Sequence, residues 1–286
     1  MEKIYRVFVY GTLRKHESNH YLIKEARCVS SQSWTNGILY DTGDGYPGMA
    51  KSTRKRVYGE VYEVDAQQLE QLDALEDYKG EGQDNLYERK IQMAHTDFGA
   101  VEAYVYVYAS PIYALEEITF GDWKCHQHLH QNELLYFAYG SCMDDERFKR
   151  DRVKHQFERV VGCGKVKNFS VAYTLKAHDG GRADLIESDE QVEGKVYRIS
   201  SETLTYLYRR EGVNDQIYRP TFIDVTIDEK TYKNVLTFLV VDKVKETAPP
   251  EHYATEILRG AKGFVSDSYY KKLVDDLYHK FGMKQI

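Results

Sequence analysis

Apolar and polar residues alternate along many short segments of this chain, and valine and tyrosine recur within them. The clearest examples are VYGEVYEV (57–64), VEAYVYVYAS (101–110) and VEGKVYRI (192–199). Alternation built from β-branched and aromatic residues is typical of β-strands. Many of the 25 tyrosines stand in such runs. The pattern therefore predicts a protein rich in strands.

Fewer segments have the spacing of helices. In the first of them, Leu69, Leu72 and Leu75 recur every three residues and would form one apolar stripe. Helices combined with many strands predict an α+β fold. The expected helices are 66–78, 201–212, 251–264 and 267–281.

Five blocks of sequence occur twice in the same order, which indicates two related halves. The second copies lie 129 to 135 positions after the first. We predict one domain at 1–124, a linker in the polar stretch 125–133, and a second domain at 134–286 that ends in a helical extension from about residue 251. The paired blocks are VFVYGTL and YFAYGSC, VYGEVYEV and VEGKVYRI, LEQLDALED and LTYLYRREG, NLYERKIQMAH and QIYRPTFIDVTI, and VEAYVYVYAS and NVLTFLVVDK.

In each half a strand is expected to end at a Tyr-Gly pair followed by a small polar residue. Glycine allows a backbone path that can present successive N–H groups to a carboxylate or an oxyanion. A plain connection between a strand and a helix would explain a single copy equally well. Helix-like polar segments follow at 14–26 and 143–151. The two turns consist of Tyr10, Gly11, Thr12 and Leu13, and of Tyr139, Gly140, Ser141 and Cys142.

An acid follows a predicted helix in each half, at Glu76 and Glu211. Partial burial beside the Tyr-Gly turn would raise the pKa of such a carboxylate and suit it to move a proton. The alternative is a solvated charge at a helix end. Tyr87 and Tyr218 open the strands that follow, where each is either a pocket wall or a half-buried strand residue.

Composition narrows the classes of function. The formal net charge of −6 and the pI of about 6.0 argue against a nucleic-acid surface as the main function. The four cysteines form no CxxC pair, and the N-terminus lacks the plan of a signal peptide. The longest apolar runs are too short to span a bilayer. We expect a soluble cytoplasmic protein with no membrane or nucleic-acid partner.

Two further chemistries are open to the residues. Cys125, His126, His128 and His130 invite a zinc hypothesis, but a structural zinc site needs four well-spaced ligands and no second pair follows. Cys142 would serve as a nucleophile only beside a histidine base, for which the spacing names no candidate. A solvated linker and a metal-free site are the simpler predictions.

The ordered motifs resemble the γ-glutamylcyclotransferase superfamily. The first half resembles its γ-glutamylamine-type branch through YGTLRK, GILYDTGDGYPGMA, VYGEVYEV, LDALEDY, LYERK and GDW. The second half resembles the longer branch through FAYGSCMDDERF, GGRADLIES, VEGKVYRI, REGV, YRPTFIDV and YATEILRGAKGF. The resemblance covers nearly the whole chain outside 125–133. It implies a small mixed β-barrel with flanking helices in each half.

The resemblance also implies a reaction. The α-amine of a γ-glutamyl amide attacks its own γ-carbonyl, which releases 5-oxoproline and a free amine or amino acid in an acyl-transfer or lyase-type cleavage without a metal or cofactor. Glu76 and Glu211 would be the bases, the two turns would hold the glutamyl group, and Tyr87 and Tyr218 would line the pockets. The longer branch has Asn where Cys142 stands, so the second half is alternatively a non-catalytic module that binds a γ-glutamyl metabolite. The leaving amine and the oligomeric state stay open.

Overall fold

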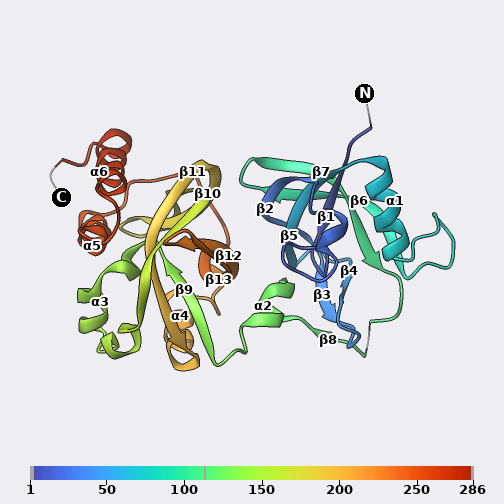
Figure 1. Ribbon diagram of the computed structural model, residues 1–286, viewed down its shortest axis with the longest axis horizontal. Helices are drawn as coiled ribbons and strands as arrows, with labels where there is room; N and C mark the ends of the chain where they lie inside the picture. Colours follow the sequence, from blue (N-terminus) through green and yellow to red (C-terminus); the bar gives the residue numbers. More distant parts are fainter. Residues whose placement is uncertain (1–2, 113, 285–286) are drawn as a thin grey trace. The chain divides into compact units, whose positions relative to one another are not determined.

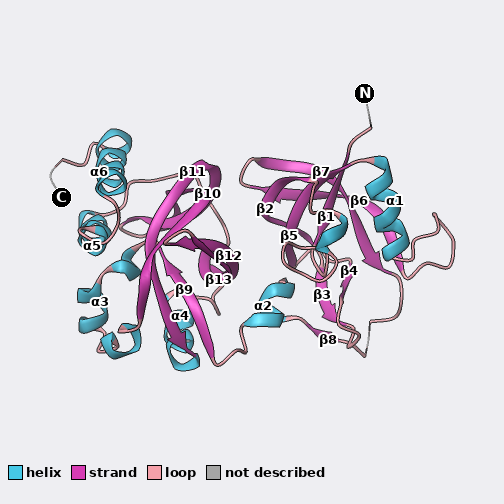
Figure 2. Ribbon diagram, viewed as in Figure 1, coloured by secondary structure: helices cyan, strands magenta, loops and turns pink. Residues whose placement is uncertain are grey.

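The computed structural model describes residues 3–112 and 114–284 and divides into two compact units, up to His128 and from Leu129 (Figure 1). Each unit is built around its own closed five-stranded barrel. Figure 2 shows the strands of both barrels with helices at their flanks. The predicted α+β fold of two small barrels is therefore confirmed.

The first barrel closes in the order β1-β5-β2-β6-β7. Its sheet is mixed, because β1 runs parallel to β7 at Val7 and Tyr104 while the other neighbours are antiparallel. A hairpin of β3 and β4 leaves the barrel and pairs with the short strand β8. The strands are β1 Tyr5–Val9, β2 Arg27–Asn36, β3 Ile38–Asp41, β4 Pro47–Ala50, β5 Arg56–Val64, β6 Tyr87–Thr96, β7 Gly99–Tyr108 and β8 Glu116–Glu117.

Helix α1 (Ala66–Leu75) begins where its sequence provides a capping box. The Asp65 side chain accepts from the backbone N–H of Gln68, and the Gln68 side chain accepts from the N–H of Asp65. Leu69 and Leu72 of the predicted stripe are buried in the unit's core. The helix ends at Leu75, three residues earlier than predicted, because its C-cap Glu76 is followed by a left-handed residue, Asp77.

The second barrel repeats the first with the strand order β10-β11-β9-β13-β12, which is the same cyclic arrangement. Strands β10 and β11 form one long hairpin. In the first unit, the corresponding strands β2 and β5 are shorter, and a separate hairpin of β3 and β4 lies between them in the chain. The strands are β9 Glu133–Ala138, β10 Val160–Ala177, β11 Gly180–Ser200, β12 Tyr218–Ile227 and β13 Lys230–Val240; the helices are α3 Asp145–Arg150, α4 Ser201–Arg210, α5 Glu251–Ala261 and α6 Asp267–Phe281.

The two barrels also share a close contact between a glycine and the neighbouring strand. A Cβ on Gly59 would lie 2.3 Å from the carbonyl oxygen of Val9, and a Cβ on Gly194 would lie 2.2 Å from that of Ala138. Both glycines occupy the third position of the repeated strand motifs VYGEVYEV and VEGKVYRI. The two barrels therefore need glycine at this position for the same reason, which is the close approach of the neighbouring strand.

Two sequence-based expectations differ from the structure. Residues 123–128 form helix α2 (Trp123–His128), in which Cys125 is buried and its N–H donates to the Asp122 carboxylate, so the predicted linker 125–133 begins too early. Residues 14–26 make turns and one short 3₁₀ segment (His20–Leu22) in place of a helix. The buried Arg14 side chain and the Lys15 N–H are both held by Glu60, which ties this backbone to strand β5.

Within the residues that the structure describes, no helix combines the length and apolarity that a membrane crossing requires.

Candidate active site

The predicted tyrosines are fixed in the same way in both units. Tyr10 donates its phenol hydrogen to the carbonyl of Tyr106, and Tyr139 donates to that of Phe238, each at 2.6 Å. Tyr87 donates to Pro47 at 2.8 Å and Tyr218 to Ala183 at 2.7 Å. All four are buried and line a cavity. Because each phenol already donates to a backbone carbonyl, these tyrosines shape the pocket walls and offer only lone pairs to a ligand.

Each acid is positioned by the backbone at the end of its helix. The N–H of Glu76 donates to Leu72, and its carbonyl accepts from the N–H of Tyr87. Glu211 makes the equivalent bonds with Leu207 and Tyr218. The residue that ends the helix is thereby bonded to the residue that opens the next strand, which places the carboxylate at the edge of the barrel beside the Tyr-Gly turn.

In the first unit this arrangement surrounds an open cavity of about 340 Å³. It brings Glu76 together with the whole turn of Tyr10, Gly11, Thr12 and Leu13, and with Tyr87. Among the residues that the structure describes, no lysine or arginine lines it. The remaining lining residues are Phe8, Val9, Ser18, Asn19, Asp44, Gly45, Tyr46, Pro47, Leu75, Leu86 and Tyr106.

The Glu76 carboxylate is partly buried against this cavity, and burial raises its pKa to about 8. Its side chain makes no hydrogen bond or ion pair with another residue in the described part of the chain. A carboxylic acid that is neutral at pH 7 and reachable from a cavity is suited to exchange a proton with a ligand. The alternative of a solvated charge at the helix end does not fit this placement.

The first turn supplies hydrogen-bond donors. The N–H groups of Gly11, Thr12 and Leu13 donate to no group within the described residues, whereas the turn's carbonyls accept from Arg14 and Asn19. A Cβ on Gly11 would lie 2.8 Å from the ring of Pro47, so a larger residue would push the turn away from the hairpin that bounds the cavity. Successive backbone N–H groups that have no other acceptor can bind a carboxylate or an oxyanion.

A buried ion cluster behind the first turn was missed by the sequence reasoning. Arg14 follows the turn directly and contacts Asp122 at 2.8 Å and Glu60 at 3.3 Å; Lys124 contacts Glu60 at 3.4 Å. All four side chains are at most 5% exposed. Burial opposes ionisation of Glu60, but Lys124 and Arg14 lower its pKa to about 2. The motifs YGTLRK, VYGEVYEV and GDWK contain the four residues of this cluster, and their basic and acidic residues were the available signal.

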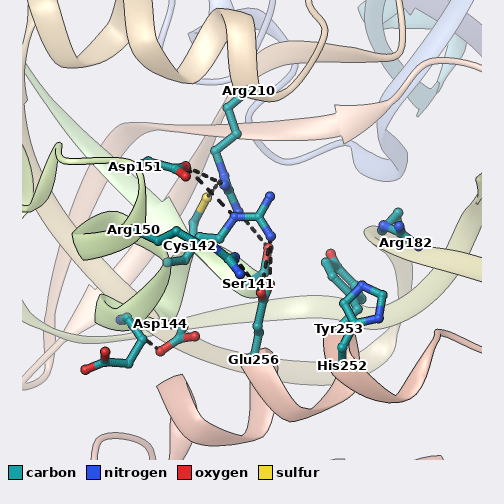
Figure 3. A network of polar contacts seen from close by, with 12 residues as sticks. Ser141, Cys142, Asp144, Arg150, Asp151, Arg182, Arg210, His252, Tyr253 and Glu256 are labelled. Carbon is teal, nitrogen blue, oxygen red and sulfur yellow. Dashed lines mark hydrogen bonds and ion pairs between the residues drawn. The ribbon is translucent and has the colours of Figure 1, made fainter.

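The second unit has the same parts around a much smaller space of about 30 Å³, lined by Tyr139, Gly140, Ser141, Cys142, Glu211 and Tyr218 among others. The guanidinium of Arg210 lies against the turn, as Figure 3 shows. Its Nε donates to the Cys142 sulfur at 3.0 Å, and an Nη donates to the Ser141 hydroxyl at 2.9 Å. The Cys142 thiol in turn lies 3.5 Å from a Glu211 carboxylate oxygen.

Glu211 thus differs from Glu76 in its surroundings. Burial raises its pKa, while Arg210, 3.7 Å away, and the Cys142 thiol act in the opposite direction. The acid and the turn lie together in both units, but in the second unit the acid already has a cationic neighbour.

Helix α5 packs onto the second turn from the other side. The Tyr253 hydroxyl accepts from the Ala183 N–H at 3.2 Å and lines the pocket. A Cβ on Gly260 would lie 2.5 Å from the backbone carbon of Met143, so the helix contacts the backbone of the residue that follows the turn. The predicted C-terminal extension therefore supports the second turn, as the ion cluster supports the first.

The other two chemistries find little support. Within the described residues, no group of three or more His, Cys, Asp or Glu side chains is arranged to hold a metal ion. His126 pairs with Asp41 at 3.1 Å. The thiol of Cys142 is buried, which raises its pKa, and its side-chain partners in the described part of the chain are Tyr136, Arg210 and Glu211, none of which is a histidine.

Family models match both units. Residues 7–125 match the model described as "Gamma-glutamyl cyclotransferase, AIG2-like", and residues 191–273 match the AIG2-like family. The first match contains the first turn, Glu76 and Tyr87. The second contains Glu211 and Tyr218 and most of the C-terminal helices.

Relatives extend the likeness over the full chain. The putative γ-glutamylcyclotransferase YkqA of Bacillus subtilis is 41% identical over 93% of this chain and 95% of its own. The crystal structure of YkqA superimposes with a TM-score of 0.87 at 40% identity, over 97% of this chain and 98% of that one. The γ-L-glutamyl-butirosin B γ-glutamyl cyclotransferase of Niallia circulans is 41% identical over 41% of this chain and 74% of its own.

The chain therefore belongs to the γ-glutamylcyclotransferase family of AIG2-like proteins and joins two of its domains in one polypeptide.

Proposed function

We propose that the first unit is a γ-glutamylcyclotransferase that converts a γ-glutamyl amide into 5-oxoproline and a free amine. The single observation that carries this proposal is the cavity that Glu76 and the first turn line together, a turn whose Gly11, Thr12 and Leu13 N–H groups donate to no other described residue. Membership of the family supports it. The glutamyl carboxylate or the γ-carbonyl oxygen would bind the N–H groups, and Glu76 would face the α-amine.

The reaction moves two protons from the α-nitrogen to the leaving nitrogen. Ionised Glu76 takes the first proton from the substrate's α-ammonium, and the freed nitrogen attacks the γ-carbonyl carbon. A tetrahedral intermediate forms, with negative charge on the oxygen that the turn stabilises. Protonated Glu76 gives its proton to the leaving nitrogen as the carbon–nitrogen bond breaks, and ionised Glu76 then takes the second proton from the ring nitrogen, which becomes the lactam N–H. This second proton passes to the released amine, which leaves as its ammonium, and Glu76 ends ionised as it began.

The pKa of Glu76 suits this role. The α-ammonium of a γ-glutamyl group is a weaker acid than an ordinary glutamic acid side chain, because its own carboxylate stabilises the positive charge. Burial brings the pKa of Glu76 from an ordinary value of about 4.3 to about 8, which narrows the difference between the pKa of the acid and that of the substrate ammonium. A smaller difference in pKa makes proton transfer in both directions easier. Binding holds the nitrogen near the carbonyl, and orientation of this kind lowers the barrier of an intramolecular attack.

The cavity also bears on the leaving group. Glu76 is the acid inside it, Asp44 stands at its exposed hairpin, and no basic side chain is among the described residues that line it. A leaving group with its own carboxylate would meet like charge at Asp44 without a cation to offset it. We infer that the first unit favours γ-glutamyl derivatives of neutral or cationic amines over those of amino acids.

The test is release of 5-oxoproline by purified protein from a panel of γ-glutamyl amides. We expect release from at least one substrate and a loss of about 10²–10⁴-fold in Glu76→Gln, which keeps the shape but cannot accept the proton. The competing function is a module that binds a γ-glutamyl metabolite without turning it over. Saturable binding by wild-type protein with no release from any substrate would favour that module and overturn the proposal.

A further inference from the structure

Arg210 lies between the acid and the turn of the second unit. It is the last residue of α4, next to Glu211, and its side chain is 10% exposed. The corresponding last residue of α1 is Leu75, which lines the open cavity of the first unit. The position before the acid is therefore apolar beside the large cavity and cationic beside the small one.

The guanidinium is held from two sides. Toward the turn it donates to Ser141 and Cys142, at 2.9 and 3.0 Å. On its other side it lies 3.7 Å from the Asp151 carboxylate (Figure 3). This carboxylate also accepts from the hydroxyl of Tyr206 at 2.7 Å. Asp151 ends helix α3. The first unit has turns in place of α3, so it lacks this anchor.

This placement excludes a γ-glutamyl ligand by volume and by charge. Only about 30 Å³ remains, against about 340 Å³ in the first unit. The cation 3.7 Å from Glu211 lies where an α-ammonium would have to approach that acid. Two cations in this enclosed space would repel each other strongly.

We propose that Arg210 closes the second pocket and thereby confines turnover to the first unit. This inference rests on the proposed function for its second part only, because closure can be measured without turnover. Cys142 reports closure, since it lies beneath the guanidinium and is 5% exposed. Cys28 is exposed and serves as a reference for full reactivity, while Cys163 is intermediate in burial in the same unit and reports any general loosening.

The experiment compares Arg210→Leu with Arg209→Leu, a matched change at the exposed neighbouring residue. N-ethylmaleimide labelling, followed by mass spectrometry of the cysteine peptides, gives the rate at each thiol. We expect labelling of Cys142 to rise at least about tenfold in Arg210→Leu and to stay unchanged in Arg209→Leu, with Cys163 constant in both. Unchanged labelling of Cys142 in Arg210→Leu, or an equal rise in Cys163, would overturn closure by Arg210.

Turnover is measured in a Glu76→Gln background, where only the second unit can act. We expect Glu76→Gln with Arg210→Leu to release 5-oxoproline at least about tenfold faster than Glu76→Gln alone, and the gain to vanish when Glu211→Gln is added. If Cys142 is labelled faster in Arg210→Leu but the rate of 5-oxoproline release does not rise, closure of the pocket is not the reason that the second unit is inactive, and the second part of the proposal fails. Substantial release by Glu76→Gln that depends on Glu211 would contradict the proposal outright. If wild-type protein releases nothing, the proposed function fails while the labelling result still decides closure.

Discussion

The two units share a barrel, a Tyr-Gly turn, two anchored tyrosines and an acid at a helix end, yet one holds a cavity of about 340 Å³ and the other about 30 Å³. The backbone bonds around Glu76 and Glu211 are equivalent. The difference in cavity volume comes from the residues that pack on the Tyr-Gly turn of each unit. The first turn is supported from behind by a buried ion cluster and faces open space, whereas Arg210 and helix α5 cover the second. Conservation of a scaffold therefore does not imply conservation of its site.

The largest effect is expected at the support of the first turn. Arg14→Met, which places the residue of the equivalent position 143 in the first unit, leaves Glu60 and Asp122 buried without their arginine. Loss of one partner of a buried ion pair costs about 3–5 kcal/mol. We expect the free energy of unfolding in urea to fall by this amount.

Arg6→Met provides the control, because Arg6 pairs with Glu63 at the surface, with a side chain 46% exposed, and should change stability by less than about 1 kcal/mol. Equal losses in the two variants would show that the cluster is not a buried support and would remove this part of the contrast between the units.

The pH dependence of kcat/KM should report Glu76. Because its folded pKa is about 8, the ionised form decreases about tenfold for each pH unit below pH 7. We expect kcat/KM to rise by this slope from pH 5.5 to pH 7 and to level near pH 8, before deprotonation of the substrate's ammonium lowers it. If kcat/KM no longer changes with pH above pH 6, the pKa of Glu76 is close to that of a solvent-exposed glutamate and is not raised.

The same pKa predicts a stability effect. The folded state keeps a proton on Glu76 that an unfolded glutamate, with a pKa of about 4.3, releases. The free energy of unfolding is therefore lowered progressively as pH rises from about 4 to about 8. Glu76→Gln removes this loss, so we expect its advantage over wild type to grow to on the order of 1–4 kcal/mol by pH 8. Thermal melts at pH 5 and pH 8 measure it, and a constant difference would argue against the raised pKa.

The smallest effect concerns the leaving group. Asp44→Asn removes an exposed charge at the cavity, where screening limits electrostatic effects to a few-fold. We expect the ratio of kcat/KM for a γ-glutamyl diamine to that for a γ-glutamyl amino acid to fall about two- to fivefold. Asp97→Asn, at a turn between β6 and β7, should leave the ratio unchanged. If this ratio is the same in Asp44→Asn as in wild type, the charge of Asp44 does not determine the preference for the leaving group.

The two barrels could be predicted from the sequence. Alternation of apolar and polar residues indicates strands with one buried face, and the repeated blocks indicate two related domains. The repeated motifs also led to the prediction that Glu76 faces the first turn, and in the structure both line one cavity. The polar, helix-like pattern of residues 14–26 led to a wrong prediction, because these residues form turns. Arg14 makes ion pairs with Glu60 and Asp122, which are distant in the sequence, and these contacts outweigh the local preference for a helix.

Arg210 shows the limit more clearly. In the sequence it is one of two arginines at the end of a helix, where basic residues are common. Its role depends on contacts with Ser141, Cys142 and Asp151, which lie about 60 to 70 positions away in the chain. The departure at Cys142 pointed to an altered second site, but only the fold reveals what fills it.

One comparison tests the central claim most directly: release of 5-oxoproline by Glu76→Gln and by Glu211→Gln under the same conditions. The account predicts that Glu76→Gln loses about 10²–10⁴-fold while Glu211→Gln stays within about twofold of wild type. Equal losses, or a larger loss in Glu211→Gln, would contradict it, because the open cavity of the first unit would then not be where the chemistry occurs.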